Sequence, residues 1–190
     1  MGTVEKIFGI NQYWDYFFNK KVITYLLETN ADGFWVYYAG LTWKEFDYEK
    51  GLDLLIKLDR TGKWIYYAGD KWKKFDFRKG FCGLLEVDKT GEYIYSSGRE
   101  WKEFDYEKAL DRLLEVDKTG RFIFNAGLYW EEFDYRKGFE RLLEVDKDGE
   151  CIYYAGKFWK EFNFRKGFER LSEIDKYGRW VNRAEIDWNK

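Results

Sequence analysis

The sequence predicts an all-α fold, a solenoid of six helix-turn-helix repeats of 29 residues each. Trp recurs at a 29-residue step from residue 14 to residue 188, and Phe stands three positions after the first six of these tryptophans. Within one repeat the apolar residues are spaced as on helical faces rather than alternating as on a strand. Because a unit of this size cannot bury its own apolar side, neighbouring repeats must stack.

The repeats divide the chain without an intervening linker. Residues 1–13 are interpreted as a lead-in, a decayed partial repeat, because Ile7 keeps the spacing to Trp14 that is seen in later copies. The six repeats are 14–42, 43–71, 72–100, 101–129, 130–158 and 159–187, and 188–190 form a tail. From residue 179 on, Asn182, Arg183 and Glu185 interrupt the recurrent pattern, which predicts a polar C-terminal cap.

The segment from Gly120 to Phe133 predicts the first helix of a pair, about 11–13 residues long. Residues that recur between copies share one side, and residues that vary share the other. The recurring set is Phe122, Ile123, Ala126, Gly127, Trp130 and Phe133, and the varying set is Arg121, Asn125, Leu128, Tyr129 and Glu132.

The segment from Asp105 to Val116 predicts the second helix, with Asp105 as its N-cap. Its apolar stripe consists of Tyr106, Ala109, Leu110, Leu113 and Val116. The residues from Asp117 to Gly120 then suit a turn that leads into the next helix.

Strands are the alternative, either as an all-β or as an α/β repeat array. The run from Lys63 to Tyr67 has high β propensity, and the Gly-containing segments can be turns. Three short strands per unit, however, would reverse the chain direction at every repeat, whereas two antiparallel helices restore it. This parity favours helices.

The residues Trp64, Ala68 and Gly80, and in the next-but-one copy Phe122, Ala126 and Gly138, resemble the tetratricopeptide repeat. That family places an aromatic residue at the start of the first helix and small residues where two helices approach closely. The segment 69–77 also looks like the junction of two helices in pentatricopeptide repeats. The period of 29 is shorter than the 34 of tetratricopeptide repeats. The resemblance implies stacked helix pairs whose first helices line a concave side where extended partners dock.

Composition limits the possible functions. Lys and Arg number 33 and Asp and Glu 35, which gives a net charge of −2 and makes a nucleic-acid partner unlikely on electrostatic grounds. No His is present, and 2 Cys cannot form a zinc site or a disulfide framework. We expect no enzymatic activity, no catalytic residues, no cofactor and no metal. No run of 18 apolar residues and no signal-peptide core occur, so we expect no membrane association and a cytoplasmic location.

Several residue patterns have a structural and a functional interpretation. Repeated turns with Asp suggest calcium, but they lack the spacing of an EF-hand loop and are better explained as structural turns. Carboxylates and lysines that recur in several copies are better explained as helix caps and surface ion pairs than as an acid–base pair. Cys82 and Cys151 lie at different places in the repeat and are interpreted as incidental thiols, and the periodic Trp and Phe as core. The turn residues are Asp59, Asp88, Asp117, Asp146 and Asp175, the other carboxylates Glu45, Asp47, Glu103, Asp105, Glu132, Asp134 and Glu161, and the lysines Lys50, Lys79, Lys108, Lys137 and Lys166.

The variable face of the first helices is the candidate binding surface, since a mixture of Tyr, Arg, Asn and Leu is typical of protein interfaces. We expect a scaffold that binds a protein or peptide partner, as a monomer or with weak self-association. A lectin-like glycan binder and, less favoured, a single-stranded RNA binder are the alternatives. The candidate residues are Tyr38, Leu41, Tyr67, Asp70, Ser96, Arg99, Asn125, Leu128, Tyr154 and Lys157.

Overall fold

The computed structural model describes residues 32–188, and in this part of the chain every regular element is an α-helix. Helices of 9 and 11 residues alternate. The 9-residue A helices are α4 (Phe34–Thr42), α6 (Lys63–Lys71), α8 (Glu92–Glu100), α10 (Arg121–Tyr129), α12 (Glu150–Phe158) and α14 (Arg179–Asp187). The 11-residue B helices are α5 (Tyr48–Leu58), α7 (Phe77–Val87), α9 (Tyr106–Val116), α11 (Tyr135–Val145) and α13 (Phe164–Ile174).

These helices confirm the predicted helix-turn-helix repeat, and the strand alternative is wrong. The run from Lys63 to Tyr67, which has high β propensity, lies within α6. The lead-in 1–13 and most of the repeat 14–42 lie outside the described residues.

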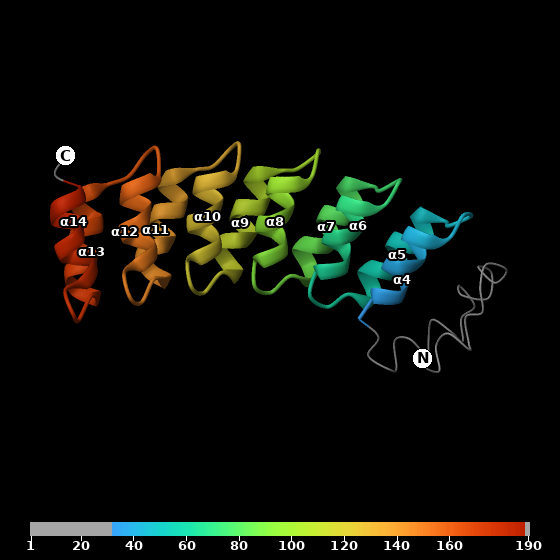
Figure 1. The fold of residues 1–190 in the computed structure, drawn as a ribbon, viewed down its shortest axis with the longest axis horizontal. Coiled ribbons are helices and arrows are strands. Elements are labelled where there is room, and N and C mark those ends of the chain that lie inside the picture. The colour runs from blue at the N-terminus through green and yellow to red at the C-terminus, as the bar shows by residue number, and fades with distance from the viewer. Residues whose placement is uncertain (1–31, 189–190) are drawn as a thin grey trace. The chain divides into compact units, whose positions relative to one another are not determined.

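The chain forms two compact units that divide after Val87. In unit 1 (up to Val87), α4 packs against α5 and α6, α6 packs against α7, and the two B helices pack on each other. In unit 2 (from Asp88), the A helices α8, α10, α12 and α14 lie side by side in chain order, and α9 and α11 are neighbours in the other layer (Figure 1). Each unit is therefore a stack of helix pairs with separate A and B layers.

The core lies between the two layers and repeats with the sequence. At least one Leu from each B helix and one Ile or Val from each A helix up to α12 are fully buried. Burying one such side chain stabilises the fold by about 1.5–3 kcal/mol. The B-helix residues are Leu55, Leu84, Leu113, Leu142 and Leu171, and the A-helix residues are Val36, Ile65, Ile94, Ile123 and Ile152.

A buried aspartate joins each of the B helices α5, α7, α9 and α11 to the next A helix, as Asp117 illustrates. Its backbone N–H caps α9 by donating to Leu113, and its carboxylate accepts the N–H groups of Phe122 and Ile123 in the first turn of α10, at 2.8 and 3.0 Å. The same carboxylate accepts from Gly120 at 2.9 Å. Gly120 has a φ of +79°, which a residue with a Cβ adopts only with strain. The turn prediction for this segment is confirmed.

The A helices are shorter than predicted because a tryptophan ends each of the first five. Trp130 has extended backbone (ψ 147°), so the chain leaves the helix after Tyr129 although the spacing alone would continue it. The extended backbone lets the buried indole reach back to α8, where Nε1 donates to the carbonyl of Tyr95 at 3.0 Å. The ring lies against Gly98, where a Cβ would be only 2.4 Å from Nε1. Tertiary packing therefore overrides the helical spacing, and the prediction that this Trp is core is confirmed.

Charged side chains cap the B helices and form surface ion pairs, as predicted, and some of these pairs link successive B helices. Asp105 accepts the N–H of Lys108 at 3.1 Å and so caps α9. Three lysines bridge successive B helices: Lys79 to Asp53 at 2.7 Å, Lys137 to Asp111 at 2.9 Å and Lys166 to Glu140 at 2.8 Å. Such exposed pairs contribute less than about 1 kcal/mol each.

Candidate binding face

The predicted binding residues lie on the outward side of the A helices, at the fifth and eighth helical positions. This surface is called the A face below. Tyr38 and Leu41 are 47% and 42% exposed. Asp70, Arg99 and Lys157 are also exposed, whereas the other predicted residues are half-buried: Tyr67, Ser96, Asn125, Leu128 and Tyr154.

In unit 1 the A face is mainly aromatic. Tyr38 stacks on Phe34 with ring centroids 6.0 Å apart, and Tyr67 lies 6.1 Å from Trp64. Asp70 forms an ion pair with Lys71 at 2.8 Å. The fixed rings form an apolar surface with one charged edge.

In unit 2 the A face combines aromatic and charged groups from neighbouring helices. The guanidinium of Arg99 on α8 lies 5.2 Å from the ring centre of Tyr129 on α10. The Ser96 hydroxyl forms a hydrogen bond within its own helix, since it donates to the carbonyl of Glu92 at 2.8 Å. Tyr154 stacks on Phe158, which is 55% exposed. The spacing placed Tyr129 in the varying set, but neither Tyr129 nor Phe158, the last residues of their helices, was among the predicted binding residues.

Lys157 belongs to a charged cluster at the contact of α12 and α14. Its ammonium lies 2.8 Å from the carboxylate of Asp187, which also accepts the hydroxyl of Tyr153. The hydrogen bond to Asp187 is the main reason why the pKa values of both Lys157 and Tyr153 are raised. Lys157 therefore stays protonated at neutral pH and helps to hold the two helices together.

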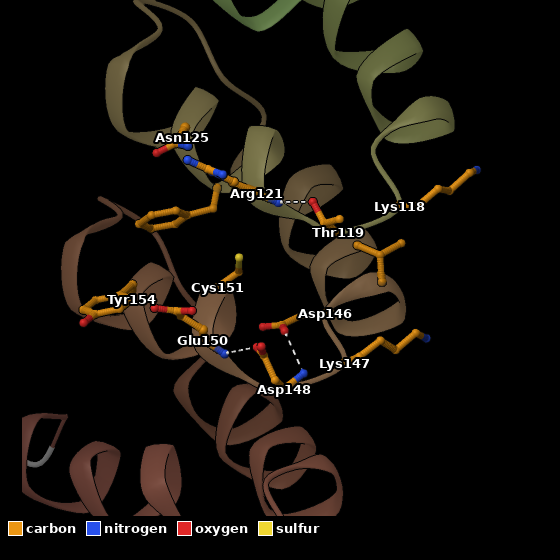
Figure 2. A pocket seen from close by; sticks show the side chains of 12 residues that line it. Lys118, Thr119, Arg121, Asn125, Asp146, Lys147, Asp148, Glu150, Cys151 and Tyr154 are labelled. Atoms are coloured by element: carbon orange, nitrogen blue, oxygen red, sulfur yellow. Dashed lines mark hydrogen bonds between the residues drawn. The ribbon is translucent and has the colours of Figure 1, made fainter. Parts of the chain in front are cut away.

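A hollow of about 680 Å³ lies between α10 and α12. It brings together two predicted residues, Asn125 and Tyr154, and Figure 2 shows Arg121 and Asn125 on one side and Glu150 and Tyr154 on the other. Cys151 lies between them, with its sulfur directed towards the opposite side (Figure 2). The complete lining is Lys118, Thr119, Arg121, Phe124, Asn125, Val145, Asp146, Lys147, Asp148, Glu150, Cys151 and Tyr154.

Cys151 is the residue that sequence reasoning undervalued. It occupies the second position of α12, where every other described A helix carries an aromatic residue, and that substitution was the available signal. The aromatic counterparts are Trp35, Trp64, Tyr93, Phe122 and Trp180. Burial raises the pKa of the Cys151 thiol, so it is neutral at physiological pH. The thiol therefore acts as a small apolar surface and not as a thiolate nucleophile.

The carboxylates of the acidic turns accept backbone hydrogen bonds, which explains why Asp recurs at these turns. Asp146, beside the hollow, accepts the N–H groups of Asp148, Gly149 and Ile152 at 3.2, 2.9 and 2.9 Å. Burial is the largest influence on its pKa and raises it, while these N–H groups act in the opposite direction. Within residues 32–188 no three acidic or Cys side chains are placed to hold a metal ion together.

The fold and the A face together define a class, an aromatic-rich α-helical repeat protein with a period of 29 residues. Comparison with protein-family models, curated proteins and solved structures finds no match. None of the helices in the described part of the chain is both long and apolar enough to cross a bilayer.

Proposed function

We propose that this protein is a non-enzymatic scaffold that binds a protein or peptide partner through the A face. The observation that carries the proposal is the contrast between core and A face. The core repeats almost without change, whereas the fifth position of the A helices in unit 2 is in turn Ser96, Asn125, Tyr154 and Arg183. Side chains that vary on a constant framework are what a repeat scaffold uses to recognise an extended partner.

The composition of the A face supports a protein partner. Tyr129 and Phe158 are 57% and 55% exposed, and Arg99 lies beside Tyr129. Exposed aromatic and Arg side chains are the residue types that dominate binding energy at protein interfaces. The glycan alternative depended on an all-β fold, whereas the described residues 32–188 form helices, and the net charge of −2 disfavours RNA. Monomeric behaviour and a cytoplasmic location remain predictions.

Selection of a displayed random-peptide library on the full chain tests the proposal. We expect peptides of micromolar affinity that weaken at least tenfold when Arg99, Asn125 and Tyr154 are replaced together by Ala. The matched control replaces three exposed B-helix residues of unit 2 by Ala and leaves affinity within twofold: Glu115, Glu144 and Glu173. Peptides that respond equally to both triple variants, or selective binding of glycans or RNA instead, would contradict the proposal.

A further inference from the structure

The hollow between α10 and α12 lies at a gap in a row of aromatic contacts. In unit 1 the second residue of α6, Trp64, lies 5.4 Å from Tyr37, the fourth residue of α4. In unit 2 the corresponding contact of Phe122 with Tyr95 is 6.0 Å, and that of Trp180 with Tyr153 is 5.1 Å. The equivalent pair for α10 and α12 is Phe124 and Cys151, which has only one ring.

Where the second position of an A helix carries Trp64 or Trp180, the indole lies close to the glycine that caps the preceding A helix. A Cβ built on Gly33 would be 3.4 Å from Cδ1 of Trp64, and one on Gly149 would be 3.4 Å from Cδ1 of Trp180. For Gly120 the residue equivalent to these tryptophans is Cys151, and its Cβ lies 4.0 Å from a Cβ built on Gly120. The side chain thus ends one atom beyond Cβ, and the hollow that Phe124 and Cys151 line stays open to the outside.

We propose that this hollow receives an aromatic side chain of the protein or peptide partner, which completes the row of rings at Cys151. The inference rests on the proposed function and specifies the partner: an extended segment with Trp, Tyr or Phe as its anchor. An aromatic ring is the chemistry that fills the equivalent space in the other described contacts. Ring pairs at such separations are favourable beyond the area that they bury.

The walls and rim of the hollow suit this occupant. Phe124 and Tyr154, whose ring centroids are 6.3 Å apart, provide two aromatic faces, and the neutral thiol of Cys151 adds an apolar surface. Basic and acidic side chains both belong to the lining of the hollow, so an anchor flanked by charges of both signs is complementary. The basic residues are Lys118, Arg121 and Lys147, and the acidic ones are Asp148 and Glu150.

The test fills the hollow from within the chain. Cys151→Phe supplies the ring that Phe122 supplies one repeat earlier, and Cys151→Ala keeps the hollow open as the matched control. We expect Cys151→Phe to raise the thermal midpoint and to weaken selected aromatic peptides at least tenfold, and Cys151→Ala to leave their affinity within threefold. Cys151→Tyr, which introduces the ring that Tyr93 carries at the same position of α8, replaces the Phe variant if that variant does not fold.

N-acetyl-L-tryptophanamide is a direct probe that does not require a selected peptide. In NMR titrations of the full chain we expect amide shifts centred on Gly120, Phe124 and Cys151, which are absent with N-acetyl-L-leucinamide and abolished by Cys151→Phe. Peptides whose affinity is unchanged by Cys151→Phe would overturn the inference while the proposed function stands. If the probe binds but no peptide of the library does, the assignment of a protein or peptide partner is overturned. If neither the probe nor any peptide binds, both proposals are refuted.

Discussion

Replacement of the buried turn aspartate Asp117 by Asn tests the mechanism that joins successive helices. The Asp117 side chain is 1% exposed, and its two oxygens accept five hydrogen bonds. An amide keeps one of these oxygens, so at least the N–H groups of Phe122 and Ile123 lose their acceptor. At about 1.5–3 kcal/mol for each bond to a charged group, the unfolding free energy should fall by about 3–6 kcal/mol. In urea this corresponds to a midpoint lower by about 1 M or more, followed by circular dichroism at 222 nm.

The matched control is Asp105→Asn, at an exposed cap in the same repeat. Asn163 already occupies the equivalent position and accepts the N–H of Lys166 at 3.1 Å, so we expect a change of less than about 0.5 kcal/mol. Hydrogen bonds from Lys108 lower the pKa of Asp105. Any extra stability that Asp105 gives over Asn is therefore present at neutral pH, and it disappears as the pH falls through the pKa of Asp105 in the folded state. Equal losses at residues 117 and 105, or a calcium-dependent rise in stability that requires Asp117, would refute the reasoning.

Four further substitutions test the packing, each by urea unfolding of the full chain. Gly127→Ala places a Cβ about 2.5 Å from the indole of Trp159 and should lower the unfolding free energy by about 1–3 kcal/mol. Gly138→Ala should lower it less, because α9 carries Ala at the equivalent position. A larger loss for Gly138→Ala than for Gly127→Ala would contradict this packing. Ser97→Ala removes a buried hydroxyl without a hydrogen-bond partner and should stabilise the fold by about 1 kcal/mol, so a loss of stability would show that the hydroxyl is satisfied. Leu113→Ala should cost about 2–5 kcal/mol, and a negligible change would mean that Leu113 is not core.

The B helices could be predicted almost to the residue because their determinants are local. The apolar stripe from Tyr106 to Val116 and the capping carboxylate of Asp105 lie within one short segment, and α9 spans that segment. The end of the A helix could not be predicted in this way. Trp130 has the spacing of a helical face, but its indole packs on Gly98 in the preceding A helix, a contact that is distant in sequence.

The candidate site likewise has a part that local sequence could predict and a part that depends on tertiary packing. Helical periodicity predicted Asn125 and Tyr154 on one variable face, and the structure places both, half-buried, in the lining of the hollow. The sequence also showed that Cys151 replaces an aromatic residue. Periodicity alone cannot tell whether neighbouring side chains collapse into the freed space or leave it open. That outcome depends on the distance between α10 and α12, which the contacts of all the repeats in the unit determine together.

The two kinds of variation in the A helices differ in what they cost the fold. Side chains at the eighth position are mostly exposed, so exchanges such as Asp70 for Arg99 change the surface with little effect on packing. The second position is different, because its ring packs against the preceding A helix, as Phe122 does against Tyr95. With Cys151 in place of an aromatic residue, the fold lacks one ring pair, which would contribute about 0.5–1.5 kcal/mol of stability in addition to the area that the ring would bury. A substitution that lowers stability and opens a lined hollow is a stronger indication of a binding role than variation that costs nothing, which is why the hollow at Cys151 is the more informative part of the A face.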